Sequence, residues 1–376
     1  MRVTPFVLPA LEAGRECTTS LLPLHPPEHL IACHPRPTLD RPVPEHCGHW
    51  FPILFSHVWS TRMNTATSER PHVAVVTDWT RPRPQAGVLP VAWLVTLLVS
   101  LLPDILLQTF TGHIPEWVLP SKLAFLAVLI VASFFSAPLR VLRGYGVMLA
   151  VLFLANLSQG QVETWSTWRQ WFGQGFTNQL LGSQILRVAV AAVMVGVLLV
   201  LQFRPREFFL TTGNLNATAA PVRWLGITKP MGWARLGAIS SLCISLGMLA
   251  FLVIAGRPPL AAVARVLPLL PMVLVLAAMN AFTEEVSFRC ALLAPLHGAV
   301  NQRQAVLMTG AFFGIAHYYG VPYGIVGVIM ASFLGWYLGK CMVETRGLFW
   351  PWFIHFLQDV LAFSFMGIGS VIAGGR

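Results

Sequence analysis

The chain has 376 residues and carries little charge, because only 11% of its residues are Asp, Glu, Lys or Arg. Ordinary soluble domains contain about a quarter charged residues. Hydrophobic residues make up 55% of the chain, and the mean hydropathy is +0.66. These values argue against a soluble enzyme, a disordered chain and a disulfide scaffold, and they indicate a polytopic protein embedded in a lipid bilayer.

The formal net charge of +10 arises almost entirely after residue 87. Residues 1–87 hold 8 basic and 7 acidic side chains, whereas residues 88–376 hold 17 basic and 8 acidic ones. Most of the later Arg and Lys residues lie between apolar runs, as in the cytoplasmic loops of membrane proteins. We therefore expect a multi-pass protein of the cell membrane with a cytoplasmic N-terminus and no nucleic-acid partner.

The first segment in chain order is a polar extension over residues 1–87. Residues 1–62 are rich in Pro and His, with weak hydrophobicity and no period, so we expect the extension to be disordered. One hypothesis is that Met63 is the native start, in which case residues 1–62 are not part of the native protein.

Nine apolar runs follow, and they predict an all-α fold, a polytopic transmembrane helix bundle of about 8–9 spans. The third run is short for a crossing of about 20 residues. The bundle divides into N-terminal transmembrane helices over 88–203, a cytosolic loop over 204–235 and a transmembrane core over 236–376. The runs lie near residues 88–110, 119–139, 145–157, 180–203, 236–255, 261–293, 304–319, 323–342 and 348–366.

Three carboxylates of the core stand within these apolar runs: Glu284, Glu285 and Asp359. A carboxylate buried among apolar groups is costly, and an isolated one becomes protonated. Each of the three is therefore expected to have a charged partner, a bound metal ion or a chemical function.

The first of these carboxylates belong to the motif Glu-Glu-x-x-x-Arg. Glu285 and Arg289 are four residues apart, so on a helix they share a face and can form an ion pair. Glu284 is rotated by about 100° from Glu285 and is left free to act chemically. The alternative is that all three are packing residues near a helix end.

Two histidines complete the set of polar residues in the core. Phe313 and His317 share a helix face, and the alternative for His317 is a satisfied residue at the membrane interface. His355 and Asp359 also share a face. They could form a structural hydrogen bond, a proton relay or half of a metal site, and their spacing does not choose among these.

The spacing of the first two motifs predicts that they meet. Glu284 and His317 are equally far from a turn near residue 300, and at 1.5 Å per residue each stands roughly 20–25 Å from it. In an antiparallel hairpin the two side chains therefore reach the same depth. His355 fits this register less well, by about 10 Å in ideal helices, so tilt or a shortened helix has to absorb the difference.

In their order on three apolar helices, the motifs EExxxR, FxxxH and HxxxD resemble the CAAX protease and bacteriocin-processing family (CPBP), also called Abi proteins. These proteins are intramembrane endopeptidases, and they include the eukaryotic type II CAAX prenyl endopeptidase. The resemblance covers about residues 225–366, and it implies that the core over 236–376 is catalytic.

The resemblance implies a role for each matching residue. Glu284 would be the general base that activates water, and His317 would hold or share that water. The remaining residues form a supporting group and an oxyanion-stabilising group: Glu285, Arg289 and Phe313 in the first, His355 and Asp359 in the second.

Asp359 departs from the pattern of the prenyl endopeptidases, which typically have Asn at this position. An ionised Asp cannot donate a hydrogen bond to an oxyanion. Asp359 would therefore be protonated, orient His355 or help to bind a metal. Asp is also common here among bacterial relatives, so it does not indicate a loss of activity.

The mechanism that the resemblance implies has two forms. Glu284, His317, His355 and Asp359 are chemically suitable ligands for a divalent metal such as Zn. The family is often described as metalloproteases, yet a metal-free glutamate mechanism is also proposed for it. Both forms stay open at the level of the sequence.

Two other functions stay as alternatives: a non-catalytic immunity or scaffold protein of the same fold, and an ion-coupled transporter. The sequence lacks the repeats and matched broken helices expected of a transporter. For a protease, the expected substrate is a peptide precursor or a membrane protein. A CAAX substrate needs a prenylated C-terminal Cys, which is mainly a eukaryotic modification, whereas this compact chain is bacterial in style.

Overall fold

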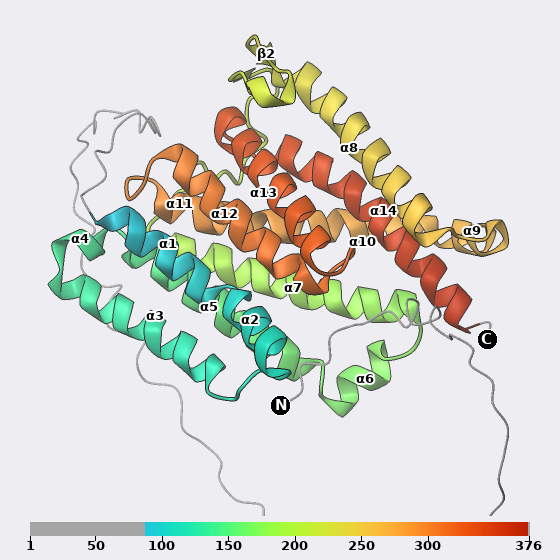
Figure 1. Ribbon diagram of the computed structural model, residues 1–376, viewed down its shortest axis with the longest axis horizontal. Helices are drawn as coiled ribbons and strands as arrows, with labels where there is room; N and C mark the ends of the chain where they lie inside the picture. The colour runs from blue at the N-terminus through green and yellow to red at the C-terminus, as the bar shows by residue number, and fades with distance from the viewer. Residues whose placement is uncertain (1–86, 375–376) are drawn as a thin grey trace, which may run out of the picture. The chain divides into compact units, whose positions relative to one another are not determined.

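The computed structural model describes residues 87–374 of the chain, and within them the architecture is an all-α bundle (Figure 1). The predictions for the N-terminal extension and for a start at Met63 lie outside the described residues. The all-α polytopic fold predicted from the apolar runs is confirmed.

The first half of the described chain consists of seven helices. They are α1 (Val88–Val99), α2 (Leu102–Thr111), α3 (Val118–Phe135), α4 (Ala137–Arg140), α5 (Arg143–Val162), α6 (Ser166–Phe172) and α7 (Phe176–Val200). Helices α1, α3 and α5 lie side by side, and α7 packs against α5 (Figure 1). Helix α5 corresponds to the short third run and has 20 residues, because it continues through polar residues beyond the run.

The first apolar run is broken into α1 and α2, which are bent by 54° relative to each other. Pro103 stands in the first turn of α2, where a missing N–H is tolerated. The Nζ of Lys122 donates to the Ser100 carbonyl at the break, at 2.7 Å, and it also pairs with Asp104. A cation from α3 therefore satisfies both the broken backbone and the carboxylate beside it.

The loop between the two halves carries a small antiparallel strand pair. Strand β1 (Thr218–Ala219) pairs with β2 (Met231–Gly232), and the 3₁₀ turn η1 (Arg223–Leu225) lies between them. Trp233 follows β2 and is fully buried, and its Nε1 donates to Glu344 Oε2 at 2.9 Å. This indole anchors the loop on the second half of the bundle.

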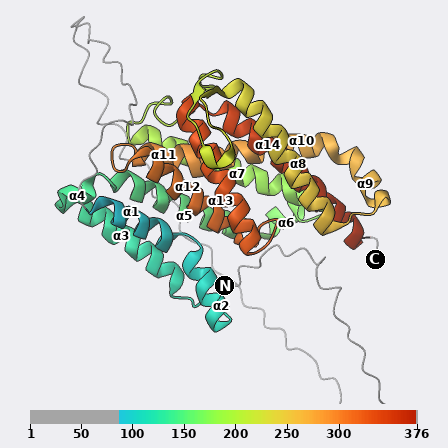
Figure 2. The same ribbon diagram turned by 45° about the horizontal axis from the view of Figure 1, so that its top comes forward.

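The second half holds the three sequence motifs. Figure 2 shows α14 beside both α8 and α10, in agreement with the contacts between these helices. The elements are α8 (Trp233–Gly256), α9 (Leu260–Val266), η2 (Leu267–Leu269), α10 (Leu270–Glu284), the π-helical η3 (Glu285–Cys290), α11 (Ala291–Leu296), α12 (Gln302–Ala316), η4 (His317–Tyr319), α13 (Ile325–Thr345) and α14 (Phe349–Gly374).

The number of candidate spans lies at the lower end of the predicted 8–9. Within residues 87–374, seven helical stretches are long and apolar enough to cross a membrane, and the bent pair α1–α2 raises the number to eight. The run at 304–319 is the exception, because α12 has only 15 residues. At 1.5 Å per residue it is about 22 Å long, which is short of a hydrocarbon core of about 30 Å.

Helices α12 and α13 approach closely through small residues. A Cβ added to Gly310 would lie 2.8 Å from the Trp336 nitrogen, and one added to Gly335 would lie 3.0 Å from the Gly310 Cα. Gly314 and Gly339 repeat the pattern four residues later on each helix, against Ser332 and Val306 respectively. Small residues at a four-residue spacing let apolar helices pack backbone to backbone within a membrane.

We expect Gly310→Val to destabilise the protein by about 1–3 kcal/mol, because the new side chain would overlap the α13 backbone. The measurement is thermal unfolding in detergent micelles. The matched control is Gly247→Val on α8, where an added Cβ meets no atom within 4 Å. Equal unfolding temperatures for the two variants would contradict the close packing.

Candidate active site

The candidate active site lies where the regular helix α10 changes into the π-helical segment η3. Glu284 is the last residue of α10 and Glu285 is the first residue of η3. Single π-helical turns within α-helices occur frequently at functional sites. This junction places two adjacent carboxylates in the interior, where Glu284 is 8% exposed and Glu285 is fully buried.

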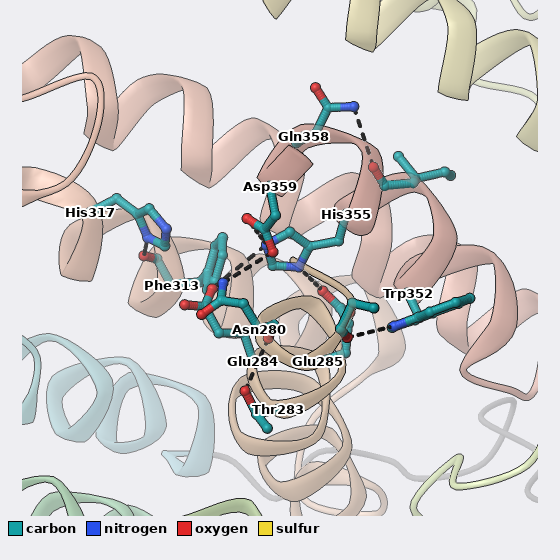
Figure 3. A network of polar contacts seen from close by, with 12 residues as sticks. Asn280, Thr283, Glu284, Glu285, Phe313, His317, Trp352, His355, Gln358 and Asp359 are labelled. Carbon is teal, nitrogen blue, oxygen red and sulfur yellow. Dashed lines mark hydrogen bonds and ion pairs between the residues drawn. The ribbon is translucent and has the colours of Figure 1, made fainter. Parts of the chain in front are cut away.

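Glu285 is held by two groups at one of its oxygens. Arg289 Nη1 lies 2.5 Å from Glu285 Oε1, and both side chains are completely buried. The same oxygen lies 2.7 Å from His355 Nδ1 on α14 (Figure 3). An ionised carboxylate only accepts hydrogen bonds, so Nδ1 of His355 carries a proton. The ion pair expected from the four-residue spacing is thus present, and it also orients a histidine.

Phe313 is a buried spacer at the centre of the site. The guanidinium carbon of Arg289 lies 4.1 Å from the centroid of the Phe313 ring, which is a cation–π contact. The His317 ring lies 4.2 Å from the same ring, between centroids, and the His355 ring meets it edge-on at 5.8 Å. Phe313 therefore separates the two histidines and supports the buried arginine.

The two oxygens of Glu284 have different surroundings. Oε1 forms an ion pair with Arg187 on α7. Oε2 is buried and has no hydrogen-bond partner among the described residues, and it faces His355 Nε2 at 3.6 Å. One oxygen is therefore fixed by an ion pair, whereas the other has no hydrogen bond to any described residue.

Asp359 lies one helical turn after His355 and is bonded to α10 rather than to a cation. Its Oδ1 is 3.7 Å from His355 Nε2, and its Oδ2 accepts a hydrogen bond from Asn280 Nδ2 at 3.0 Å (Figure 3). Asn280 Oδ1 in turn accepts from Gln184 Nε2 on α7, at 3.1 Å. These bonds join α7, α10 and α14 through buried polar side chains.

His317 stands at the end of α12, apart from the group around His355 (Figure 3). Its Nδ1 lies 2.8 Å from the Phe313 carbonyl, which can only accept, so Nδ1 carries a proton. In the neutral ring Nε2 is then the atom with a free lone pair. His317 is thus fixed in one tautomer by its own helix.

Glu284 and His317 line the same cavity, whose volume is about 320 Å³. The hairpin geometry predicts that these two residues meet, and both are found in the wall of this cavity. Arg187 also lines the cavity, together with Thr283 and Ser287. The rest of the wall consists of Leu101, Leu152, Asn156, Gln159, Val190, Phe288, Ala316, Tyr319 and Gly320.

His355 joins the site without the offset of about 10 Å estimated from ideal parallel axes. It bonds directly to Glu285, as described above. Helix α14 crosses α10 at an angle in Figure 1, so an equal-depth rule for antiparallel helices does not apply to this pair. Six of the seven residues predicted for the site lie in one network, and His317 reaches it through Phe313 and the cavity.

Three residues of the site lie outside the sequence prediction: Arg187, Gln184 and Asn280. Gln184 and Arg187 are three residues apart in the apolar helix α7, so they share a face. Asn280 stands four residues before Glu284 on α10. Pairs of polar residues three or four positions apart in otherwise apolar helices are the sequence signal that could have identified these three residues.

The arrangement of the acids and histidines does not fit a metal site. Within residues 87–374, no group of three or more His, Cys, Asp or Glu side chains is placed to hold a metal ion. His317 lies beyond Phe313, and the Nδ1 of His355 already bonds to Glu285. The described residues therefore do not form a set of ligands for a divalent metal.

The fold and the site define a multi-pass membrane protein with a buried cluster of acids, arginines and histidines. Residues 266–361 match the family described as Type II CAAX prenyl endopeptidase Rce1-like, and this segment contains all three motifs. This match supports the resemblance to the CAAX protease family that the three motifs predicted. No curated protein and no solved structure matches the chain.

We expect Arg289→Met to lower the free energy of unfolding by about 3–5 kcal/mol, because Glu285 would be left buried without its cation. Thermal unfolding in detergent measures the change. Arg143→Met is the matched control, since within residues 87–374 Arg143 bonds to Ser133 and stacks on Phe134 near the end of α3, with no carboxylate partner. An Arg289→Met variant as stable as this control would contradict the assigned ion pair.

Proposed function

We propose that the protein is an intramembrane endopeptidase that hydrolyses a peptide bond in a membrane-associated protein or peptide. The observation that carries the proposal is the asymmetry of Glu284, a residue that lines the cavity: one oxygen is paired with Arg187, and the other is buried without a hydrogen-bond partner among the described residues. A water molecule bound at this free oxygen is placed for activation by a general base.

In the proposed reaction, Glu284 takes a proton from this water while the water oxygen attacks the carbonyl carbon of the scissile peptide bond. The carbonyl π electrons move to oxygen and form a tetrahedral intermediate. When the intermediate collapses, the carbon–nitrogen bond breaks, and the leaving nitrogen takes a proton from protonated Glu284. The products are a carboxylic acid and an amine, and Glu284 returns to its starting state.

His317 and the Glu285 cluster have different parts in this proposal. His317 lines the cavity, and its Nε2 has a free lone pair, so it can accept a hydrogen bond from the attacking water and orient it. Glu285 and Arg289 hold His355 in place from the buried side. A rigid, largely dry surrounding of this kind strengthens electrostatic interactions at the reacting atoms.

The cavity supports a peptide rather than a small polar metabolite as the substrate. Its volume of about 320 Å³ is at the lower end of ligand pockets and suits a short stretch of extended chain. Apolar side chains of four spans or span ends contribute to its wall, including Leu152, Val190 and Phe288. We propose a peptide precursor or a membrane protein as the substrate.

The variant Glu284→Gln is expected to lose proteolysis, by at least about 10²-fold, while still inserting and folding, because an amide cannot act as the base. The measurement uses purified full-length protein in detergent and a mixed pool of internally quenched peptides. Glu116→Gln, in an exposed loop, is the matched control and should cleave like the wild type.

A Glu284→Gln variant with full activity would refute the base assignment. An immunity, scaffold or transport function predicts instead that the wild type, Glu284→Gln and Glu116→Gln all leave the peptides intact. The two outcomes therefore separate a wrong mechanism from a wrong function.

A further inference from the structure

The tetrahedral intermediate of peptide hydrolysis carries a negative oxygen, and a protease active site has to stabilise it. Preorganised donors or cations aimed at this oxygen are usually the largest single contribution to catalysis. The family resemblance assigns this role to His355 and to the residue four positions later, here Asp359. The following inference rests on the proposed endopeptidase function.

The geometry around His355 and Asp359 directs their polar atoms toward one another instead of toward the cavity. His355 Nδ1 bonds to Glu285, and its Nε2 lies between Glu284 Oε2 and Asp359 Oδ1 at 3.6 and 3.7 Å. Asp359 Oδ2 is occupied as an acceptor by Asn280. Of the described residues, those that line the cavity include Glu284 but neither His355 nor Asp359.

Arg187, unlike His355 and Asp359, lies at the cavity. Its side chain is 38% exposed, and it is the one Arg or Lys among the described residues that line the cavity. A guanidinium has five N–H donors, and Nη1 makes the ion pair with Glu284 Oε1. The Nε atom is buried and has no hydrogen-bond partner among the described residues. Donors of Arg187 thus remain for an oxygen that forms beside Glu284.

The helix that carries Arg187 is fixed against the catalytic core. Gln184, one turn earlier on α7, donates to Asn280 at 3.1 Å, and both side chains are buried. Arg187 and Gln184 therefore reach α10 as two adjacent contacts, at Glu284 and at Asn280. A cation held by two packed helices needs little rearrangement during the reaction, which is the condition for effective electrostatic stabilisation.

We propose that Arg187 is the catalytic residue that stabilises the oxyanion, and that His355 and Asp359 are positioning residues. As the water oxygen bonds to the carbonyl carbon, the π electron pair moves to the carbonyl oxygen, whose negative charge then lies beside the Arg187 guanidinium. When the carbonyl re-forms, this charge returns to the carbon–oxygen bond and the carbon–nitrogen bond breaks. Arg187 neither gains nor loses a proton. The active site therefore includes α7, which lies outside the segment 266–361.

The test measures kcat and KM of the purified full-length protein in lipid nanodiscs, with one internally quenched peptide that the wild type cleaves from a mixed pool. For Arg187→Gln we expect kcat to fall by about 10²–10³-fold with KM changed by less than about threefold, since the lost interaction is made only in the transition state. Arg187→Lys keeps the charge but not the fork of donors, and it should recover part of kcat. Arg143→Gln, remote from the cavity, should match the wild type.

Other outcomes would overturn the inference. Wild-type kcat in Arg187→Gln would remove Arg187 from catalysis. A displaced pH profile with an unchanged maximal kcat would show that Arg187 acts only through Glu284, and a rise in KM alone would assign it to substrate binding. If Arg187→Gln does not fold, Arg187→Lys provides the test. A kcat of Arg187→Lys equal to that of the wild type would contradict a requirement for the guanidinium N–H donors. Failure of the proposed function looks different: the wild type cleaves no peptide, or Glu284→Gln remains fully active.

Discussion

The cost of placing charge in an apolar bundle is the constraint on which the rest of this structure depends. A carboxylate or guanidinium in such surroundings is tolerated only when another charge or several hydrogen bonds compensate it. The site meets this condition by gathering three acids with two arginines and a histidine. The acids are Glu284, Glu285 and Asp359, and the basic groups are Arg187, Arg289 and His355.

The hydrogen bonds and ion pairs that compensate these charges form two parallel rows of side chains, each of which joins helices α7, α10 and α14. One row runs from Gln184 through Asn280 to Asp359, and the other runs from Arg187 through Glu284 toward His355. Each helix contributes residues one turn apart, so packing the three helices aligns both rows at once. Within the described residues, two carboxylate oxygens of these rows have no hydrogen-bond partner, Oε2 of Glu284 and Oδ1 of Asp359, and both lie near His355 Nε2. The oxygen that would act as the base in the proposed reaction is therefore one that the network leaves without a hydrogen bond.

Much of this arrangement could be predicted from local spacing in the sequence. The ion pair of Glu285 and Arg289 and the shared face of Phe313 and His317 follow from four-residue periods, and the shared cavity of Glu284 and His317 follows from their equal distance to a turn. Arg187 could not be predicted in the same way, because its partner is about a hundred residues away and no local period links them. The apolar run at 304–319 does not form a helix long enough to span the membrane, for a different reason. Hydropathy reports composition, whereas helix α12 ends at Ala316, where the 3₁₀ turn that carries His317 begins.

In the proposed function, Glu284 is the residue that makes this membrane bundle a protease. The most direct measurement is a comparison of peptide termini in membranes from cells that make either the wild-type protein or Glu284→Gln at equal levels, by labelling and mass spectrometry of newly formed N-termini. The account predicts a set of new termini in or beside membrane-embedded segments with the wild type, absent with the variant, and accumulation of the uncut proteins with the variant. Identical sets of termini in the two membranes would contradict it.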